Sequence, residues 1–180
     1  DELAWKFGSL TIGDGAGAIV LEATDDMLYL VDDHHMKFSY ELSDGQYHLC
    51  TIGLNYSLGE RYKLYTHTPN LFKSVHGVTK ECVKNHCLRS NGSERAYDNL
   101  FYHDVGKMAQ GIILSLLAES SITVKCPEAD FYAEYGNVAS VSLPLSMWRA
   151  REKGYFKKGN LALCVIPASG TQCGIFSLRY

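Results

Sequence analysis

Two helices are visible in the spacing of apolar residues along the chain. One is predicted from Leu71 to about Leu88, with Asn70 as a candidate N-cap and Ser90-Asn91-Gly92 as its stop. The other is predicted from Val105, because apolar residues follow it at helical spacing. These residues are Val105, Met108, Ala109, Ile112, Ile113, Leu116 and Leu117. Both helices would therefore pack one apolar face against another layer.

Strands and a third helix fill the rest of the second half. The run from Leu161 to Ile166 is apolar throughout, which is typical of a strand buried on both faces. Leu100-Phe101-Tyr102 is predicted as a short buried strand, and residues 174–180 as the last strand. A helix is predicted from Ser142 to Lys153, closed by Gly154. This alternation predicts an α/β fold, layered α-β-α with helices against a mixed sheet.

The first half is predicted to consist of short strands. Residues 9–22 give a strand, a Gly13-Asp14-Gly15 turn and a second strand. A strand at 27–31 is followed by a polar turn at Asp32-Asp33-His34-His35, and residues 38–54 form a hairpin around an Asp-Gly pair. The Tyr-rich residues 55–70 receive no assignment.

Two of these segments have alternative interpretations. The glycines from Gly13 to Gly17 could form a phosphate-binding loop, but β-branched residues and no helix start follow them, which favours close backbone packing. The residues Asp32 to His35 could bind a metal ion, but neighbouring side chains on a strand point to opposite faces. A solvated loop is favoured, and no metal site is predicted.

Composition indicates an ordinary soluble domain. The 180 residues are 46% hydrophobic and 21% charged, with a formal net charge of −3, so one sizeable core is expected. This charge gives no electrostatic reason to expect nucleic acid or an anionic membrane as a partner. No apolar run approaches the roughly 20 residues of a membrane span.

The six cysteines have irregular spacings and no Cys-x-x-Cys pair. They are Cys50, Cys82, Cys87, Cys126, Cys164 and Cys173. We interpret them as reduced, mostly buried thiols, which favours a cytoplasmic protein.

Candidate chemistry centres on His103 and on the turn Gly136-Asn137. An Asn side chain at a turn offers two N–H donors to a reacting carbonyl, although bonding to its own backbone is the ordinary alternative. Ser140 or Ser142 is predicted to cap the helix that follows, with Pro144 in its first turns. If Asp104 caps the helix from Val105, His103 lies at a helix N-terminus, where a neutral imidazole is favoured. A core histidine satisfied by backbone is the alternative.

An ordered set of motifs resembles the C-terminal portion of a β-ketoacyl-acyl-carrier-protein synthase III, in the thiolase-like superfamily. The strongest are the block from Gly13 to Ala18 and the Gly-Asn-x-x-Ser block at 136–140 ahead of a helix with Pro144. His103, Lys158-Gly159-Asn160 and the late loop at 169–174 follow the same order. The resemblance extends over nearly the whole chain.

The resemblance implies a condensing enzyme that joins an acyl group to a malonyl thioester by decarboxylative Claisen condensation. His103 and Asn137 would donate hydrogen bonds to the malonyl thioester carbonyl, and we predict that they approach each other closely. The Ser169-Gly170 turn would supply an oxyanion N–H. Acyl-CoA and malonyl-acyl-carrier-protein would be the substrates, with no bound cofactor. The Cys nucleophile of the family would lie outside this chain, which on its own would be incomplete.

The family resemblance also predicts organisation and partners. Residues 1–26 would be closing strands of an N-terminal thiolase-like half, and residues 27–180 the C-terminal thiolase-like domain. The segment from Ala18 to Leu21 would be covered by that N-terminal half, from the same polypeptide or a second chain, because an open apolar edge promotes aggregation. Acyl carrier protein would be a partner, and the assembly a homodimer.

Departures from the family pattern keep other functions open. After His103 the chain reads Asp104-Val105-Gly106-Lys107-Met108 where the family has Gln-Ala-Asn-x-Arg, and the late loop begins with Pro167-Ala168 instead of a glycine run. These changes favour a divergent, secondary-metabolite acyltransferase over housekeeping fatty-acid initiation. The alternatives are a non-catalytic thiolase-like subunit that dimerises and shapes a partner's acyl pocket, or a generic α/β binding domain.

Overall fold

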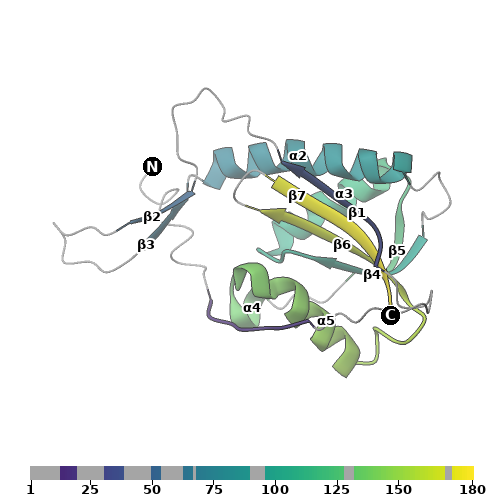
Figure 1. Ribbon diagram of the computed structural model, residues 1–180. Helices are drawn as coiled ribbons and strands as arrows, with labels where there is room; N and C mark the ends of the chain where they lie inside the picture. Colours follow the sequence, from purple (N-terminus) through teal and green to yellow (C-terminus); the bar gives the residue numbers. More distant parts are fainter. Residues whose placement is uncertain are drawn as a thin grey trace.

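A mixed five-stranded sheet forms the centre of the molecule. The computed structural model describes residues 13–19, 31–38, 50–53, 63–66, 68–89, 96–127, 132–168 and 172–180. The strands are β1 (Val31–Phe38), β4 (Ala96–Tyr102), β5 (Thr123–Pro127), β6 (Leu161–Ala168) and β7 (Gln172–Arg179), in the order β1-β7-β6-β4-β5 (Figure 1). β4 runs parallel to β5 and β6, whereas β7 is antiparallel to β6 and β1. The predicted mixed sheet is therefore confirmed.

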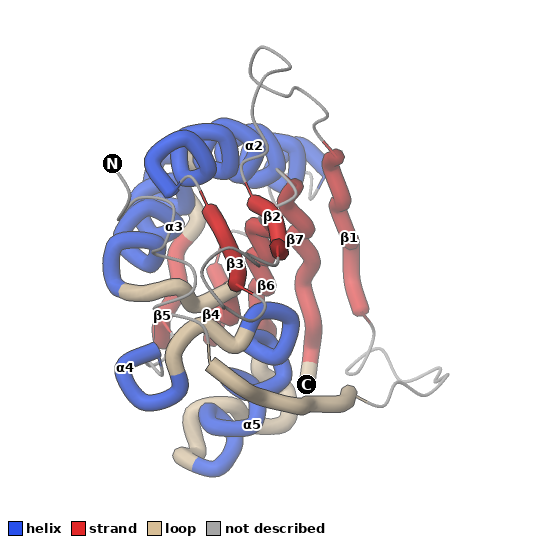
Figure 2. Tube along the Cα trace, turned by 90° about the vertical axis from the view of Figure 1, so that its left-hand side faces the viewer, coloured by secondary structure: helices blue, strands red, loops and turns tan. Residues whose placement is uncertain are grey.

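Helices cover both faces of this sheet. The helices are α2 (Thr68–Arg89), α3 (Lys107–Glu119), α4 (Tyr132–Tyr135) and α5 (Ser142–Glu152), with the 3-10 turn η3 (Ala139–Val141) before α5. α2 packs on β7, β1 and α3, whereas α5 packs on β4. Figures 1 and 2 show α2 and α3 together on one side and α4 and α5 on the other. The layered α-β-α architecture predicted from the sequence is confirmed.

Strand β6 is buried on both faces. Its successive side chains point to opposite sides of the sheet, so they pack into two different clusters. Leu163 and Val165 belong to the core that also contains Val78 and Cys82 of α2 and Ile113 of α3. The neighbouring positions, Ala162 and Cys164, pack with Phe101, Phe156 and Ala150 of α5 in a second cluster. One apolar strand therefore joins both helical layers to the sheet.

Two predictions for the first half are wrong. The segment from Asp32 to His35 is part of β1, paired with β7 across a register shift between Asp32 and His34, and is no turn. Pairing with a neighbouring strand overrides the polarity of these residues, which local pattern cannot show. Residues 13–19 are extended but form no strand. The other residues of 9–22, residues 27–30 and the turn at 43–45 lie outside the described residues.

A separate antiparallel pair joins β2 (Cys50–Gly53) to β3 (Lys63–Thr66). β2 confirms a strand near the end of the predicted hairpin at 38–54, but it pairs with β3 from the stretch 55–70, for which no element was predicted. The predicted turn lies outside the described residues. Helix α2 begins at Thr68, so Asn70 lies inside the helix rather than at its N-cap.

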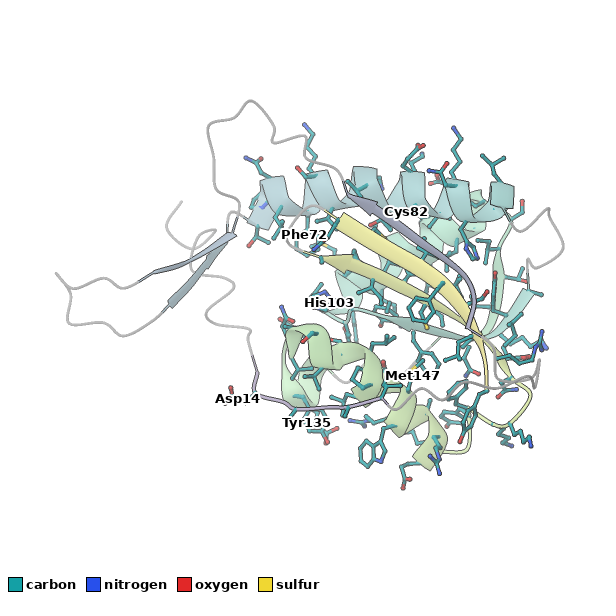
Figure 3. The ribbon with its side chains drawn as sticks, viewed as in Figure 1. Asp14, Phe72, Cys82, His103, Tyr135 and Met147 are labelled. Carbon is teal, nitrogen blue, oxygen red and sulfur yellow. The ribbon has the colours of Figure 1, made fainter. Side chains whose placement is uncertain are left out.

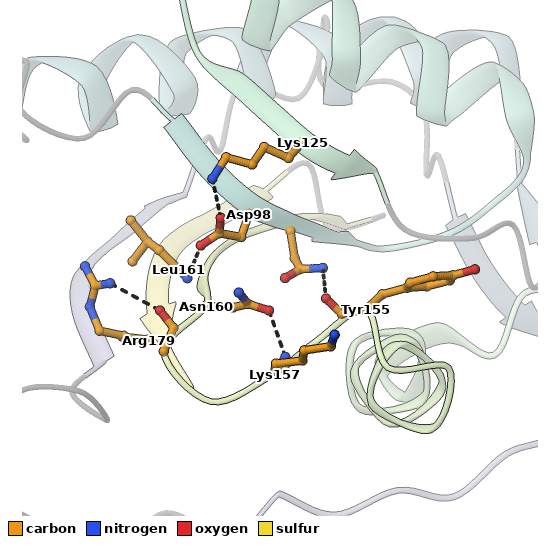
Figure 4. A network of polar contacts seen from close by, with 9 residues as sticks. Asp98, Lys125, Tyr155, Lys157, Asn160, Leu161 and Arg179 are labelled. Atoms are coloured by element: carbon orange, nitrogen blue, oxygen red, sulfur yellow. Dashed lines mark hydrogen bonds and ion pairs between the residues drawn. The ribbon is translucent and has the colours of Figure 1, made fainter.

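A network of polar contacts lies at the end of the sheet where β4 and β6 begin (Figure 4). Asp98 accepts hydrogen bonds from Lys125 Nζ at 2.7 Å and from the Leu161 backbone N–H at 2.9 Å. These two bonds, with the Lys125 bond the larger cause, lower the pKa of Asp98 from its ordinary value of 3.8. The charged carboxylate is therefore favoured by folding.

Asp98→Asn is expected to lower the free energy of unfolding at pH 7 by about 1 kcal/mol, because the neutral amide loses the charged bond to Lys125. Because the pKa of Asp98 is lower in the folded than in the unfolded protein, its charged form stabilises the fold at pH values above the unfolded pKa. This stabilisation is lost as the pH falls through the folded pKa. The difference between the proteins should therefore shrink below about pH 4. Urea unfolding at several pH values measures it. Glu119→Gln, at the exposed pair with Lys80, is the control and should change little.

Candidate active site

The two predicted site residues lie at one edge of the sheet. His103 follows β4 directly, and its backbone N–H donates to Val165 O of β6 at 3.3 Å, which continues the parallel pairing. Asn137 comes after β5, in the turn between α4 and η3. Because the carboxyl ends of parallel strands share an edge, the segments after β4, β5 and β6 converge there. Figure 3 shows His103 between the sheet and the α4–α5 layer.

His103 and Asn137 are in contact, although 34 positions separate them. Nε2 of His103 lies 3.1 Å from Oδ1 of Asn137. Nδ1 of His103 lies 2.9 Å from the carbonyl oxygen of Pro167. Both side chains are half-buried. The predicted approach of the two residues is confirmed.

The amide of Asn137 has a fixed orientation. Its Oδ1 accepts the backbone N–H of Ala139 at 3.0 Å. The bond of Asn137 to its own backbone is therefore real, but it uses only the oxygen. Because Oδ1 faces Ala139, the two N–H donors of Nδ2 lie on the other side of the amide group. They can donate to an acceptor such as an oxygen atom of a ligand.

The contacts of His103 constrain the position of its proton. The Pro167 carbonyl and Asn137 Oδ1 can both only accept, so each contact requires a proton on the ring nitrogen that faces it. The neutral ring can therefore donate to only one of these two oxygens, whereas the imidazolium donates to both. Pro167 was not predicted as a site residue, because a backbone acceptor leaves no signal in side-chain chemistry.

The predicted relation of His103 to a helix N-terminus is wrong. α3 begins at Lys107, with Gly106 as its N-cap at φ 109°, rather than at Val105. Asp104 is buried, and its two oxygens accept the backbone N–H groups of Gly106 at 2.9 Å and Tyr132 at 3.2 Å. Asp104 thus joins the start of α3 to the start of α4. His103 is therefore not held at a helix end that would favour a neutral imidazole.

The Asn137 turn has two residues with positive φ, and one of them, Ala139, is strained. Gly136 has φ 70° and Ala139 has φ 48°, and the latter is unfavourable for a residue with a Cβ. Neither η3 nor α5 has a side-chain cap, so the predicted capping by Ser140 or Ser142 is wrong. The Ser142 hydroxyl is instead buried without a hydrogen-bond partner. Strain of this kind is common where a structure holds a functional group in place.

Ala139→Gly is expected to raise the free energy of unfolding by roughly 0.5 kcal/mol, because relief of the left-handed strain exceeds the added chain entropy of glycine. Ala139→Val should lower it by more than about 1 kcal/mol, since a β-branched residue is poorly tolerated at positive φ. Urea unfolding of the two variants measures both changes. If glycine destabilises as much as valine, the turn is not strained at Ala139.

Two of the described cysteines are not suited to act as nucleophiles. Cys82, Cys164 and Cys173 are buried and Cys87 is half-buried, none of them in a disulfide, as predicted for these four. Burial raises the pKa of the Cys164 thiol, and contact with Cys82 followed by burial raises that of Cys173. A thiol attacks as the thiolate, so these two would be unreactive.

The remaining predicted features are only partly described. Ser169 and Gly170, predicted to supply an oxyanion N–H, lie outside the described residues. Within the described ranges, no group of three His, Cys, Asp or Glu side chains could hold a metal ion. No helix in the same ranges is both long and apolar enough to cross a bilayer.

Comparison with known proteins finds similarity to a curated protein over nearly the whole chain. No family model matches the chain. An acyl-CoA:acyl-CoA alkyltransferase of Shewanella oneidensis is 28% identical over 184 residues, covering 98% of this chain and 50% of that protein.

Solved structures show the same fold. 3-Oxoacyl-(acyl carrier protein) synthase III, FabH, of Pseudomonas aeruginosa matches with a TM-score of 0.67 and 16% identity, over 88% of this chain and 48% of that one. Cerulenin-bound OleA of Xanthomonas campestris matches with a TM-score of 0.63 and 16% identity, over 84% and 39%. The resemblance found in the sequence is confirmed: this chain has the thiolase-like α/β fold of synthase III-like condensing enzymes and spans about half the length of the curated relative it matches.

Proposed function

We propose that this chain is part of a condensing enzyme that forms a carbon–carbon bond between two acyl thioesters. The observation that carries the proposal is the contact of His103 Nε2 with Asn137 at 3.1 Å, at the sheet edge where three parallel strands end. A histidine and an amide held together from distant positions can stabilise one developing negative charge. The relationship to an acyl-CoA:acyl-CoA alkyltransferase supports the same reaction class.

In the proposed reaction, an acyl group is held as a thioester on a Cys that lies outside this chain. A malonyl thioester loses CO2, and its electron pair passes to the thioester carbonyl as an enolate. Nδ2 of Asn137 and Nε2–H of protonated His103 donate to that oxygen, while Pro167 O and Ala139 N–H hold the two side chains in place. The enolate carbon attacks the acyl carbonyl, which releases the Cys thiol and the 3-oxoacyl thioester. The Cys leaves as a thiolate and takes up one proton from solvent, so the overall reaction consumes one proton with the malonyl carboxylate.

A second candidate is condensation of two acyl-CoA molecules without loss of CO2, which the name of the Shewanella oneidensis relative favours. A proton must then leave the α-carbon of one acyl-CoA. In the tautomer that donates from Nδ1 to Pro167 O, the lone pair of His103 Nε2 can accept a proton. The same two residues therefore support either reaction.

The whole protein is proposed to use acyl-CoA and, in the first route, malonyl-acyl-carrier-protein. We propose that residues 27–180 form its second thiolase-like domain and residues 1–26 part of the first, in a homodimer. We extend the proposal to a divergent acyltransferase of secondary metabolism that uses the same two residues. The non-catalytic alternative, a subunit that shapes a partner's acyl pocket, predicts no turnover by any of these routes.

The test uses the complete natural protein that contains this sequence. It is incubated with acyl-CoA plus either malonyl-acyl-carrier-protein or a second acyl-CoA, and products are identified by mass spectrometry with 14CO2 release measured in parallel. A 3-oxoacyl product with equal CO2 supports the first route, and a 2-alkyl-3-oxoacyl product without CO2 supports the second. No condensation product under either condition would refute the catalytic proposal and support the subunit alternative.

A further inference from the structure

The segment 13–19 runs along the turn that carries Asn137, although more than a hundred residues separate them in sequence. Figures 1 and 2 both show it beside α4 and α5. Residues 13–19 are assigned to no strand, and they are exposed except for half-buried Gly13. Its contact with the turn is therefore made mainly by backbone and by glycines.

Gly13 makes the central contact of this segment. Its backbone N–H donates to the carbonyl oxygen of Asn137 at 2.8 Å. A Cβ added at Gly13 would lie 1.8 Å from the carbonyl oxygen of Tyr135, a backbone atom that a rotamer change cannot move. Only glycine allows the two backbones to approach this closely.

The next two glycines, Gly15 and Gly17, face the same turn but differ in the space available for a side chain. A Cβ at Gly15 would lie 3.4 Å from the side chains of Val138 and Val141, which is ordinary contact. A Cβ at Gly17 would lie 2.9 Å from Cγ of Pro144. The glycines therefore follow the turn and the start of α5, and the tightest point is the one next to Asn137.

Asn137 is held from three sides in this arrangement. Gly13 binds its backbone carbonyl, Ala139 binds its side-chain oxygen, and His103 contacts the same oxygen. Because Ala139, two residues after Asn137, has a strained positive φ, external contacts are needed to keep the geometry of the turn. Gly13 supplies such a contact from a different part of the chain.

We propose that Gly13 is a positioning residue for Asn137, which sets the direction of the amide N–H donors through the bond to the Asn137 carbonyl. The proposal concerns the same site as the proposed function and rests on it for its catalytic consequence. The positioning itself is measurable without turnover, so failure of one can be distinguished from failure of the other.

The first experiment compares Gly13→Ala with Gly15→Ala in the complete 15N-labelled protein. The side-chain NH2 signals of Asn137 are assigned by their loss in Asn137→Asp. They are expected to shift or broaden in Gly13→Ala and to stay in place in Gly15→Ala, where the added methyl has room. Unchanged Asn137 side-chain signals in a folded Gly13→Ala protein would overturn the proposal.

If Gly13→Ala does not fold, the wild-type protein still provides a test. The Gly13 amide should exchange slowly with solvent because it is bonded to Asn137 O, and rapid exchange at Gly13 would refute the contact.

The catalytic arm is a double-mutant cycle. Gly13→Ala is expected to lower kcat about 100-fold with little change in KM, as expected when a catalytic group is misplaced by about 1 Å. In an Asn137→Ala background it should cause no further loss, because the group that it positions is gone. An equal loss in both backgrounds would show that Gly13 acts only through stability. If the wild-type protein shows no turnover, the NMR comparison alone decides the positioning claim.

Discussion

Asn137→Asp is expected to lower kcat for condensation by about 100- to 1,000-fold, the usual effect of removing one donor from a developing oxyanion. Aspartate keeps an oxygen for the Ala139 N–H and the His103 contact, so the turn should survive. It replaces the two N–H donors by a second, negatively charged oxygen. Steady-state kinetics of the complete protein, with circular dichroism to confirm folding, measures the change.

Asn160→Asp is the matched control for this substitution. Asn160 also accepts a backbone N–H through Oδ1, from Lys157 at 2.8 Å, but at the opposite edge of the sheet (Figure 4). Its replacement makes the same chemical change away from the site and should leave kcat within about twofold. A similar loss of activity in both variants would show that the effect is one of charge or folding, and would remove Asn137 from the site.

His103→Ala is the second large expected effect, again a loss of about 100- to 1,000-fold in kcat. The substitution removes the group at Nε2 and leaves the Pro167 carbonyl without its bond. His76→Ala, on the exposed face of α2, is the control and should have no effect on turnover.

The two residues should also act together. If they stabilise one oxygen, the double variant with Asn137→Asp should lose far less than the product of the two single losses, because residues that act as a unit are not additive. Fully multiplicative losses would mean that His103 and Asn137 serve different steps.

Local sequence pattern predicted α3, α5, β6 and β7 of the second half, but not β5 or α4. The apolar run of β6 predicted a strand buried on both faces, and the spacing around Ile113 predicted α3 to within two residues of its start. Burial of one face of a helix or both faces of a strand is recorded directly in residue type, which explains this success. The ordered motifs then indicated the fold and the pairing of His103 with Asn137.

What the sequence could not show depends on long-range backbone contacts. The place of Asp32 to His35 in β1 comes from pairing with β7, and the role of Pro167 from its carbonyl group. The Asp104 carboxylate was expected at a helix cap but binds Gly106 and Tyr132 instead. The glycines near Gly13 were correctly linked to close packing, but their partner, the Asn137 turn, could not be identified from the pattern alone.

The most direct test of the central claim is a crystal structure of the complete protein with a non-reactive malonyl thioester analogue. The account predicts that the thioester carbonyl oxygen lies roughly 2.7–3.1 Å from both Nε2 of His103 and Nδ2 of Asn137. Nδ1 of His103 should still bind Pro167 O, and Asn137 Oδ1 should still accept from Ala139. A bound analogue whose carbonyl oxygen contacts neither side chain would contradict the claim that these two residues stabilise the enolate.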